Sequence, residues 1–492
     1  MGIACSAVSL ADDPYSKRSS PPVSHKPPPV SSHSKPPSNS RVTPPKASTR
    51  IPGQSLQRAP AQSQANRPMA RPPVTGAPRK DAPPSGSSGL HEQTSAPGSH
   101  AAVTYKDVQA HPMPASREEF RTQGGGMLRT RADGSRAEIH DARRGMDIHY
   151  GLNGSRHVVM ERSDHSRVFA ERGGRGYVQH PYEYRGQEFA HRTYFDHGHE
   201  FVRFYARYPY HGMTLEVYTP TTYYPVGFYG WVYTPWGEPV HYAWQWRGTP
   251  WYRLYGGYFT PYSVYGSAPL WLTDYVIATG LQAAYAEQVR AQIAAGNGLA
   301  PLSPEVKDEI AQEVQVEVQQ EMAAARANTG NSGAPEDGGI STLLRDGHSH
   351  VFMPGSVLDL VDASGNECTL SPGDVVQVRA APAPGAQAVN ATVLASKGGY
   401  ECASDGTVRM PLADLQESEN YMRQTVEQGM ADLQAKQGTG NLPPAPVGAQ
   451  GALVNAGFAA GAPPPDANVE AEIAEQAGAA DLAERETADA QQ

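Results

Sequence analysis

The chain has 492 residues, of which 18% are charged and 39% hydrophobic, and its net charge is −9. That length allows about three domains, but 44 prolines and 49 glycines reduce the part that can be ordered. Residues 1–126 carry 15 Lys/Arg against 7 Asp/Glu, residues 127–275 carry 16 Arg and no Lys against 14 acids, and residues 276–492 carry 10 bases against 29 acids. The bases of the first segment are dilute and interrupted by Pro, which favours a solvated linker over binding to an anionic polymer or a membrane. We expect no specific nucleic-acid partner.

Residues 1–126 are predicted to be a disordered Pro/Ser-rich segment, because they offer too little apolar surface to offset the entropy of ordering them. Three interpretations of its start remain open. Residues 1–11 resemble the end of a truncated signal peptide, since Ser9-Leu10-Ala11 resembles a cleavage site. Alternatively, Gly2 and Ser6 match an N-myristoylation motif beside Cys5, or the pattern is accidental.

Residues 127–267 are predicted to form an antiparallel β-meander rich in Tyr and Trp. Turn signals at 132–135, 153–155, 164–166, 173–176, 185–187 and 196–199 separate short strand-like runs at hairpin spacing. In 200–208 the even positions from Val202 to Tyr208 are apolar and the odd positions alternate aromatic residues with Arg, which predicts a stacked Arg/aromatic surface layer. From 209 to 266 the strands shorten, and we expect tight turns and extended pieces packed by rings.

The stretch from Tyr177 to Tyr275 contains 31 aromatic residues, among them all six Trp. Two interpretations compete for it. The rings cement a thin sheet that has few aliphatic side chains, or they form an exposed platform that stacks on the sugars of a cell-wall polymer. We favour cement, and the candidate binding residues of the alternative are Trp231, Trp236, Trp244, Trp246 and Trp251.

Residues 268–330 are predicted to form amphipathic helices, and 331–347 a linker. The second helix, 303–327, starts with Ser303 as N-cap and Pro304 in its first turn. Its apolar stripe of Val306, Ile310, Val314, Val318 and Met322 is a packing face, either on the meander or in self-association with another chain. The most apolar stretch, 268–286, carries Asp274 near its middle, so we expect no transmembrane span.

Residues 348–412 are predicted to form a small SH3-like β-barrel module of about five short strands, followed by a helix at 413–438 and a disordered acidic Ala/Pro-rich tail at 439–492. Cys368 and Cys402 fall in the module, and we expect them to form a disulfide, which suits an oxidising compartment. Two buried thiols in a cytosolic protein are the alternative.

Several blocks resemble a group of bacterial proteins that are predicted to be exported or envelope-associated. They include RGMDIHYGLNGSR (144–156), WLTDYVIATGLQAAYAEQ (271–288), SGNECTLSPGDVVQV (364–378) and TVLASKGGYEC (392–402). The similarity extends over roughly residues 140–435. It implies a periplasmic or secreted location but no activity, because none is established for the group.

The sequence lacks the usual signatures of hydrolases, metalloproteases and nucleotide-binding proteins. The tightest cluster of candidate metal ligands is Asp196, His197, His199 and Glu200, since two His separated by one residue can face the same side of an extended chain. The alternative is a polar hairpin tip. We therefore expect a non-catalytic exported or cell-envelope structural or interaction protein without a cofactor. Carbohydrate or cell-wall polymer binding is the first alternative, and a metal-binding protein or hydrolase is the second.

Overall fold

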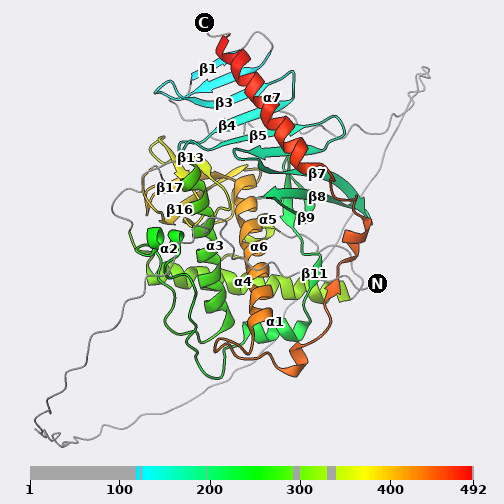
Figure 1. The fold of residues 1–492 in the computed structure, drawn as a ribbon, viewed down its shortest axis with the longest axis vertical. Coiled ribbons are helices and arrows are strands. Elements are labelled where there is room, and N and C mark those ends of the chain that lie inside the picture. The colour runs from blue at the N-terminus through cyan, green and yellow to red at the C-terminus, as the bar shows by residue number, and fades with distance from the viewer. Residues whose placement is uncertain are drawn as a thin grey trace, which may run out of the picture. The chain divides into compact units, whose positions relative to one another are not determined.

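Two large antiparallel sheets, a two-stranded pair and seven helices make up the described part of the chain (Figure 1). The computed structural model describes residues 118–121, 125–196, 198–291, 300–329, 339–399 and 401–489. All of them fall in one unit that extends from Gln93 to Gln492. The predicted mainly β class is confirmed. The start of the chain, with its candidate signal and acylation sites, lies outside the described residues.

The meander is a ten-stranded sheet in which consecutive strands are neighbours, from β1 to β10. Its strands are β1 (Glu118–Arg121), β2 (Met127–Thr130), β3 (Arg136–Asp141), β4 (Met146–Tyr150), β5 (Arg156–Glu161), β6 (Arg167–Glu171), β7 (Arg175–Tyr184), β8 (Gln187–Asp196), β9 (His199–Tyr210) and β10 (Met213–Tyr218). The predicted turn signals coincide with its hairpin turns. At 153–155, for example, the Asn153 side chain accepts a hydrogen bond from the Ser155 N–H at 2.9 Å, while Gly154 adopts a φ of +80°. The sheet begins at Glu118 rather than at 127.

One face of the meander carries a ladder of stacked rings that crosses six strands. Neighbouring ring centroids are 4.7 to 5.5 Å apart, close to the spacing of the strands themselves. The rings of this ladder are His149, His157, Phe169, Tyr177, Tyr194 and Phe201. Such cross-strand contacts add stability where aliphatic side chains are scarce.

The opposite face is apolar and is covered by α7 (Val469–Asp489), which runs across β5 to β8 (Figure 1). Val469, Ile473, Ala480 and Ala483 of the helix join the buried Ile, Val, Leu and Met side chains of the sheet in one core cluster. The prediction of a disordered tail at 439–492 is therefore wrong. An Ala/Glu-rich segment has too few apolar side chains to form a core by itself, but this one buries its apolar stripe against the apolar face of the meander.

Ion pairs along the rim of α7 reinforce this contact. Arg156 pairs with Asp481 at 2.9 Å and with Glu484 at 2.6 Å. Arg144 pairs with Glu486 at 3.0 Å, and Arg162 pairs with Glu472 at 2.8 Å. The acidic end of the chain thus meets arginines of the meander, so the uneven charge distribution has a structural use within the chain.

The aromatic stretch after β10 contains more helix than expected. It includes β11 (Thr222–Tyr223), paired with β18 (Val454–Asn455), and the short helices α1 (Val226–Tyr233) and α2 (Pro250–Tyr255). The long helices α3 (Ala268–Ala291) and α4 (Pro304–Thr329) follow, and the one-turn helix α5 (Ile340–Leu343) lies where a linker was predicted.

The apolar stripe of α4 is buried within the chain. Val306, Ile310, Val314 and Val318 are buried and Met322 is packed against the same core, where α4 contacts α1, α3 and α6 (Leu412–Lys436). This stripe is therefore a packing face within the chain, and self-association through the 303–327 helix stays a prediction.

The C-terminal module is a six-stranded antiparallel sheet with the order β12-β15-β16-β17-β13-β14. Its strands are β12 (His350–Phe352), β13 (Leu358–Asp362), β14 (Glu367–Leu370), β15 (Val375–Val378), β16 (Ala388–Ala395) and β17 (Thr407–Pro411). Closure into an SH3-like barrel stays a prediction. After β17 comes α6, one residue earlier than predicted.

The helix α6 covers the open edge of the meander. The Asn420 side chain accepts a hydrogen bond from the Tyr218 N–H at 2.8 Å and donates one to the Glu216 carbonyl at 2.7 Å. Both partners belong to β10, the last strand of the sheet. A helix side chain thus occupies backbone groups that an eleventh strand would otherwise take.

The predicted Arg/aromatic surface layer of β9 is also covered at its centre. Tyr205 is fully buried, its ring lies 3.9 Å from the Arg192 guanidinium carbon, and its hydroxyl accepts a hydrogen bond from Gln424 of α6 at 3.0 Å. The alternation was correctly assigned to a strand. That it forms a surface layer is wrong, because α6 packs against it.

We expect Ile473→Ala in α7 to lower the free energy of unfolding by about 2–5 kcal/mol, because a fully buried aliphatic side chain is lost from the core that α7 shares with the meander. Chemical denaturation of the purified chain measures it. The control is Leu482→Ala on the same helix, whose side chain is 49% exposed and which we expect to change stability by no more than about 0.5 kcal/mol. Equal effects of the two substitutions would contradict this packing of α7.

Candidate functional site

The five tryptophans predicted as binding residues lie in the main core or against it. Trp236 and Trp251 are buried, whereas Trp231, Trp244 and Trp246 are half-buried and packed on the core. Trp244 is stacked between two rings, with centroid distances of 4.0 Å to Trp246 and 4.7 Å to Trp271. The faces of this indole are therefore occupied by neighbouring rings. Whether the rings bind a polymer stays a prediction.

Trp244 also starts a chain of hydrogen bonds that leads into the core. Its indole N–H donates to the Tyr265 hydroxyl at 2.6 Å, and that hydroxyl donates to Asp274 at 2.6 Å. Asp274 is fully buried and pairs with Lys307 of α4 at 2.8 Å. Burial raises the pKa of Asp274, although Lys307 opposes the shift. The arrangement ties the aromatic stretch to α3 and α4.

The predicted metal ligands lie at the β8–β9 hairpin. Asp196 lies opposite His199 in the strand pairing, and both His199 and Glu200 are exposed, while His197 lies outside the described residues. Asp196 lies 3.8 Å from Arg175. Across the described ranges, no group of three or more His, Cys, Asp or Glu has an arrangement that could hold a metal ion. Metal binding at this hairpin stays untested.

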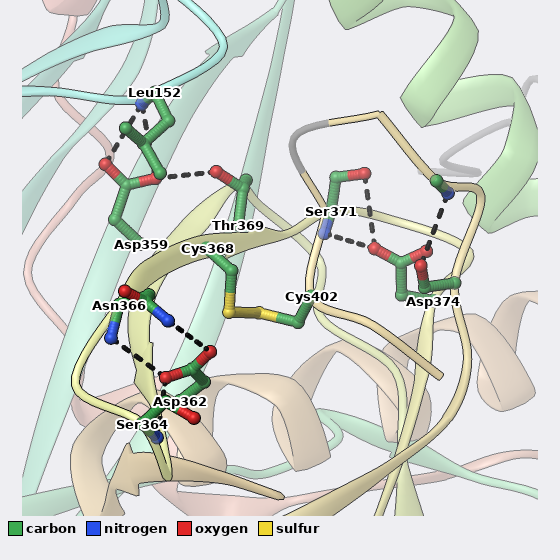
Figure 2. The surroundings of a disulfide bond; sticks show 12 residues. Leu152, Asp359, Asp362, Ser364, Asn366, Cys368, Thr369, Ser371, Asp374 and Cys402 are labelled. Atoms are coloured by element: carbon green, nitrogen blue, oxygen red, sulfur yellow. Dashed lines mark hydrogen bonds between the residues drawn. A yellow bond between two sulfur atoms is a disulfide. The ribbon is translucent and has the colours of Figure 1, made fainter. Parts of the chain in front are cut away.

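Cys368 and Cys402 form a disulfide, with their Cα atoms 4.8 Å apart (Figure 2). Cys368 belongs to β14, and the Cys402 N–H donates to the Thr369 carbonyl at 2.9 Å. The bond therefore fastens the segment after β16 to the edge strand of the module. The pairing predicted from the sequence is present.

A cluster of buried carboxyl groups between α4 and α6 was not predicted from the sequence. Glu313, Glu317 and Glu321 follow one another at four-residue spacing on α4, and all are at most 5% exposed. Glu419 of α6 faces them and is 1% exposed. The cation nearby is Arg423, which lies 3.7 Å from Glu317 and 3.8 Å from Glu419. These contacts are too long for strong hydrogen bonds.

Burial shifts the pKa values of three of these groups, Glu317, Glu321 and Glu419, upwards, towards the protonated form. It raises the pKa of Glu321 to about 8, with a contribution from the charge of Glu427, while the hydrogen bond from Tyr229 opposes the shift. Burial and the neighbouring Glu419 raise the pKa of Glu317, and burial raises that of Glu419 despite Arg423. With a pKa near 8, Glu321 keeps its proton inside the fold at neutral pH.

His350 is a structural cation at one end of this cluster. Its imidazole lies 3.1 Å from Glu313 and 3.1 Å from Asp346. Burial alone would lower the pKa of His350, but the hydrogen bonds to Glu313 and Asp346 raise it to about 9. The imidazolium therefore clamps β12 to α4.

A sequence signal for the cluster did exist. Each of the three glutamates of α4 directly precedes a residue of the apolar stripe, namely Val314, Val318 and Met322. A helix buried on more than one side places such neighbours inside as well. The predicted packing face was nevertheless limited to the apolar stripe, because buried carboxylates are uncommon.

Comparison with known proteins adds no assignment: no protein-family model, no curated protein and no solved structure matches the chain. Along the described segments, no helix is both long and apolar enough to cross a lipid bilayer.

We expect the free energy of unfolding to fall as the pH rises from about 4.5 to about 8, because Glu321 keeps its proton in the folded state over this range and loses it in the unfolded state. Glu321→Gln removes that penalty, and we expect it to stabilise the protein at pH 8 by roughly 1–3 kcal/mol. Denaturant titrations at several pH values measure both effects. The control, Glu305→Gln, removes an exposed carboxyl whose pKa is lowered by hydrogen bonds near the start of α4 and should not stabilise. Stability that is independent of pH would refute the buried, protonated state.

We expect Trp236→Ala and Trp251→Ala each to cost about 3–5 kcal/mol of stability, because each substitution removes a buried ring and leaves a cavity. Trp231→Ala should cost less, since that ring is half-buried. Thermal and chemical unfolding of the three variants ranks them. Near-neutral substitutions at all three positions would show that the rings do not cement the fold.

Proposed function

We propose that the protein is an exported, non-catalytic structural or interaction protein of the bacterial cell envelope. The observation that carries the location is the disulfide between Cys368 and Cys402. Such bonds persist in oxidising compartments and are rare in the cytosol. The resemblance to predicted exported proteins supports the same location.

The structural role is supported by how the charged side chains are used. The Arg192 guanidinium contacts Gln179, Glu216 and Glu417, and so joins three strands of the meander and α6. Arg131 is likewise held by Asp359 at 2.9 Å and by Glu367 at 2.7 Å. In both cases a buried or half-buried charge joins segments that are far apart in the sequence.

Polymer binding is the second candidate, and the partial exposure of Trp231 and Trp246 favours it. Retention on an insoluble cell-wall preparation tests it directly. If Trp→Ala variants at these positions remain stable but are no longer retained on the cell-wall preparation, polymer binding replaces the structural proposal. If the parent protein is not retained, the structural role stands.

We expect the protein isolated from its native source to contain the Cys368–Cys402 disulfide, detected as a linked pair by peptide mapping without reductant. On the chain-entropy account, closing this loop stabilises the fold by roughly 3–4 kcal/mol, so Cys402→Ala should lower the melting temperature. Cys5→Ser, which leaves the pair intact, is the control. Two free thiols in the native protein would contradict the proposed location.

A further inference from the structure

Four polar side chains meet beside the disulfide in the C-terminal module. Ser371 and Asp374 lie between β14 and β15, and Lys397 and Glu401 lie after β16. The Lys397 amine is 2.6 Å from Asp374 Oδ1 and 3.1 Å from Glu401 Oε1. Asp374 is fully buried, and the Lys397 side chain is 2% exposed. An amine and two carboxyl groups therefore share one dry site.

The surroundings hold Asp374 in a fixed orientation. Its Oδ2 accepts the Ser371 N–H at 2.7 Å, and its Oδ1 accepts the backbone N–H of Lys397 at 3.1 Å. Figure 2 shows Ser371 and Asp374 near Cys402. The adjacent Gly373 carbonyl accepts a hydrogen bond from the buried Tyr258 hydroxyl at 2.9 Å.

Glu401 is held in place from two sides. Its Oε1 accepts the Ser371 hydroxyl at 2.6 Å, and its neighbour Cys402 is fixed by the disulfide. Within the described part of the chain, Glu401 Oε2 is buried without a hydrogen-bond partner. A buried polar atom left in this way calls for an explanation, and a role in proton transfer supplies one.

We propose that Lys397 and Asp374 become joined by an intramolecular isopeptide bond, with Glu401 transferring the proton. The observations that carry the proposal are the contact of amine and carboxyl, the second carboxyl on the same amine, and the exclusion of water. Because the fold already holds the reacting groups in contact, the reaction itself no longer carries the entropy cost of bringing them together. The cross-link does not depend on the proposed cellular location.

The reaction is a condensation that needs no oxidant and no further reactant. It starts from the neutral amine of Lys397 and the protonated carboxyl of Asp374, which one proton transfer within the ion pair produces. The Nζ lone pair attacks Cγ of Asp374, and the C=O electron pair moves onto Oδ2, where the Ser371 N–H stabilises it. Glu401 takes a proton from Nζ and returns it to the departing Oδ1 hydroxyl. The C–O bond breaks, and one amide and one water result.

The low polarity of the site favours both the reactive state and the product. Burial raises the pKa of Asp374 to about 7, with Lys397 opposing the shift and Glu401 adding to it. A protonated carboxyl is therefore accessible near neutral pH. The amide also removes two buried charges, whose desolvation is costly, and replaces them with a neutral group.

The molecule contains a natural comparison in the buried pair Asp274–Lys307. Its amine is similarly close to the carboxylate, at 2.8 Å, but its other contacts are the Thr260 carbonyl at 2.9 Å and the ring of Tyr262. In the described part of the chain, the carboxylate paired with Lys307 is Asp274 itself. Asp308 acts on the Lys307 amine through its charge, but among the described residues no second carboxyl is recorded within ion-pair distance of it, so we expect this pair to stay ionic.

The test is the intact mass of the purified full-length chain after the disulfide is reduced. We expect a mass below that of the sequence by one water, and a proteolytic peptide in which Lys397 and Asp374 are linked. Lys397→Arg and Glu401→Gln should restore the full mass. Lys307→Arg, the same change at the comparison pair, should leave the loss of water in place.

Two results would overturn the proposal. One is a folded wild-type chain with the full sequence mass, and the other is a loss of water that persists in Lys397→Arg. Even where a variant does not fold, the presence or absence of the Lys397–Asp374 linked peptide in the wild-type protein supports or overturns the proposal.

Discussion

Burial of the polar face of α6 is the constraint on which the rest of the structure depends. Asn420 occupies the backbone groups of the last meander strand, and Gln416 accepts the Ile340 N–H at 3.0 Å. Both side chains are 1% exposed. Buried polar groups are costly unless every partner is in position, so α6 has one docking geometry on the sheet. That geometry also protects the meander from pairing edge to edge with another chain.

On the ring-ladder face of the meander, contacts between rings take the place of aliphatic packing, and they determine what these rings can offer a ligand. In the ladder across the meander, His157 and Phe169 each stack against rings on both sides, whereas Tyr177 stacks on Phe169 and meets Tyr194 at a tilt of 52°. A ring in such a row presents its edge outward, whereas stacking on a sugar needs a free face. The arrangement therefore favours cement over a polymer platform at these positions.

The strands and α6 could be predicted because their signals are local: turn residues at hairpin spacing, alternation, and a helix that begins after Pro411. The helix α7 could not, because its stability comes from Ile473 against the meander and from arginines more than three hundred positions away. The burial of the α4 glutamates could not be predicted for the same reason. Their side of the helix is buried only because α6 packs against it. The disulfide was predicted because both cysteines fall in one module. The isopeptide site was missed because Asp374 and Lys397 are 23 positions apart and carry no motif.

The two kinds of cross-link lie where the meander is anchored. Arg131, in the first described hairpin turn of the meander, is gripped by Asp359 and by Glu367, the residue next to Cys368. Asp359 also accepts the Leu152 N–H of a second turn at 3.1 Å (Figure 2). Rings and ion pairs hold the sheet together, but each of these contacts can open separately. Covalent closure of the module keeps Asp359 and Glu367 in position for these contacts, so the module anchors two turns of the meander through one pair of carboxylates.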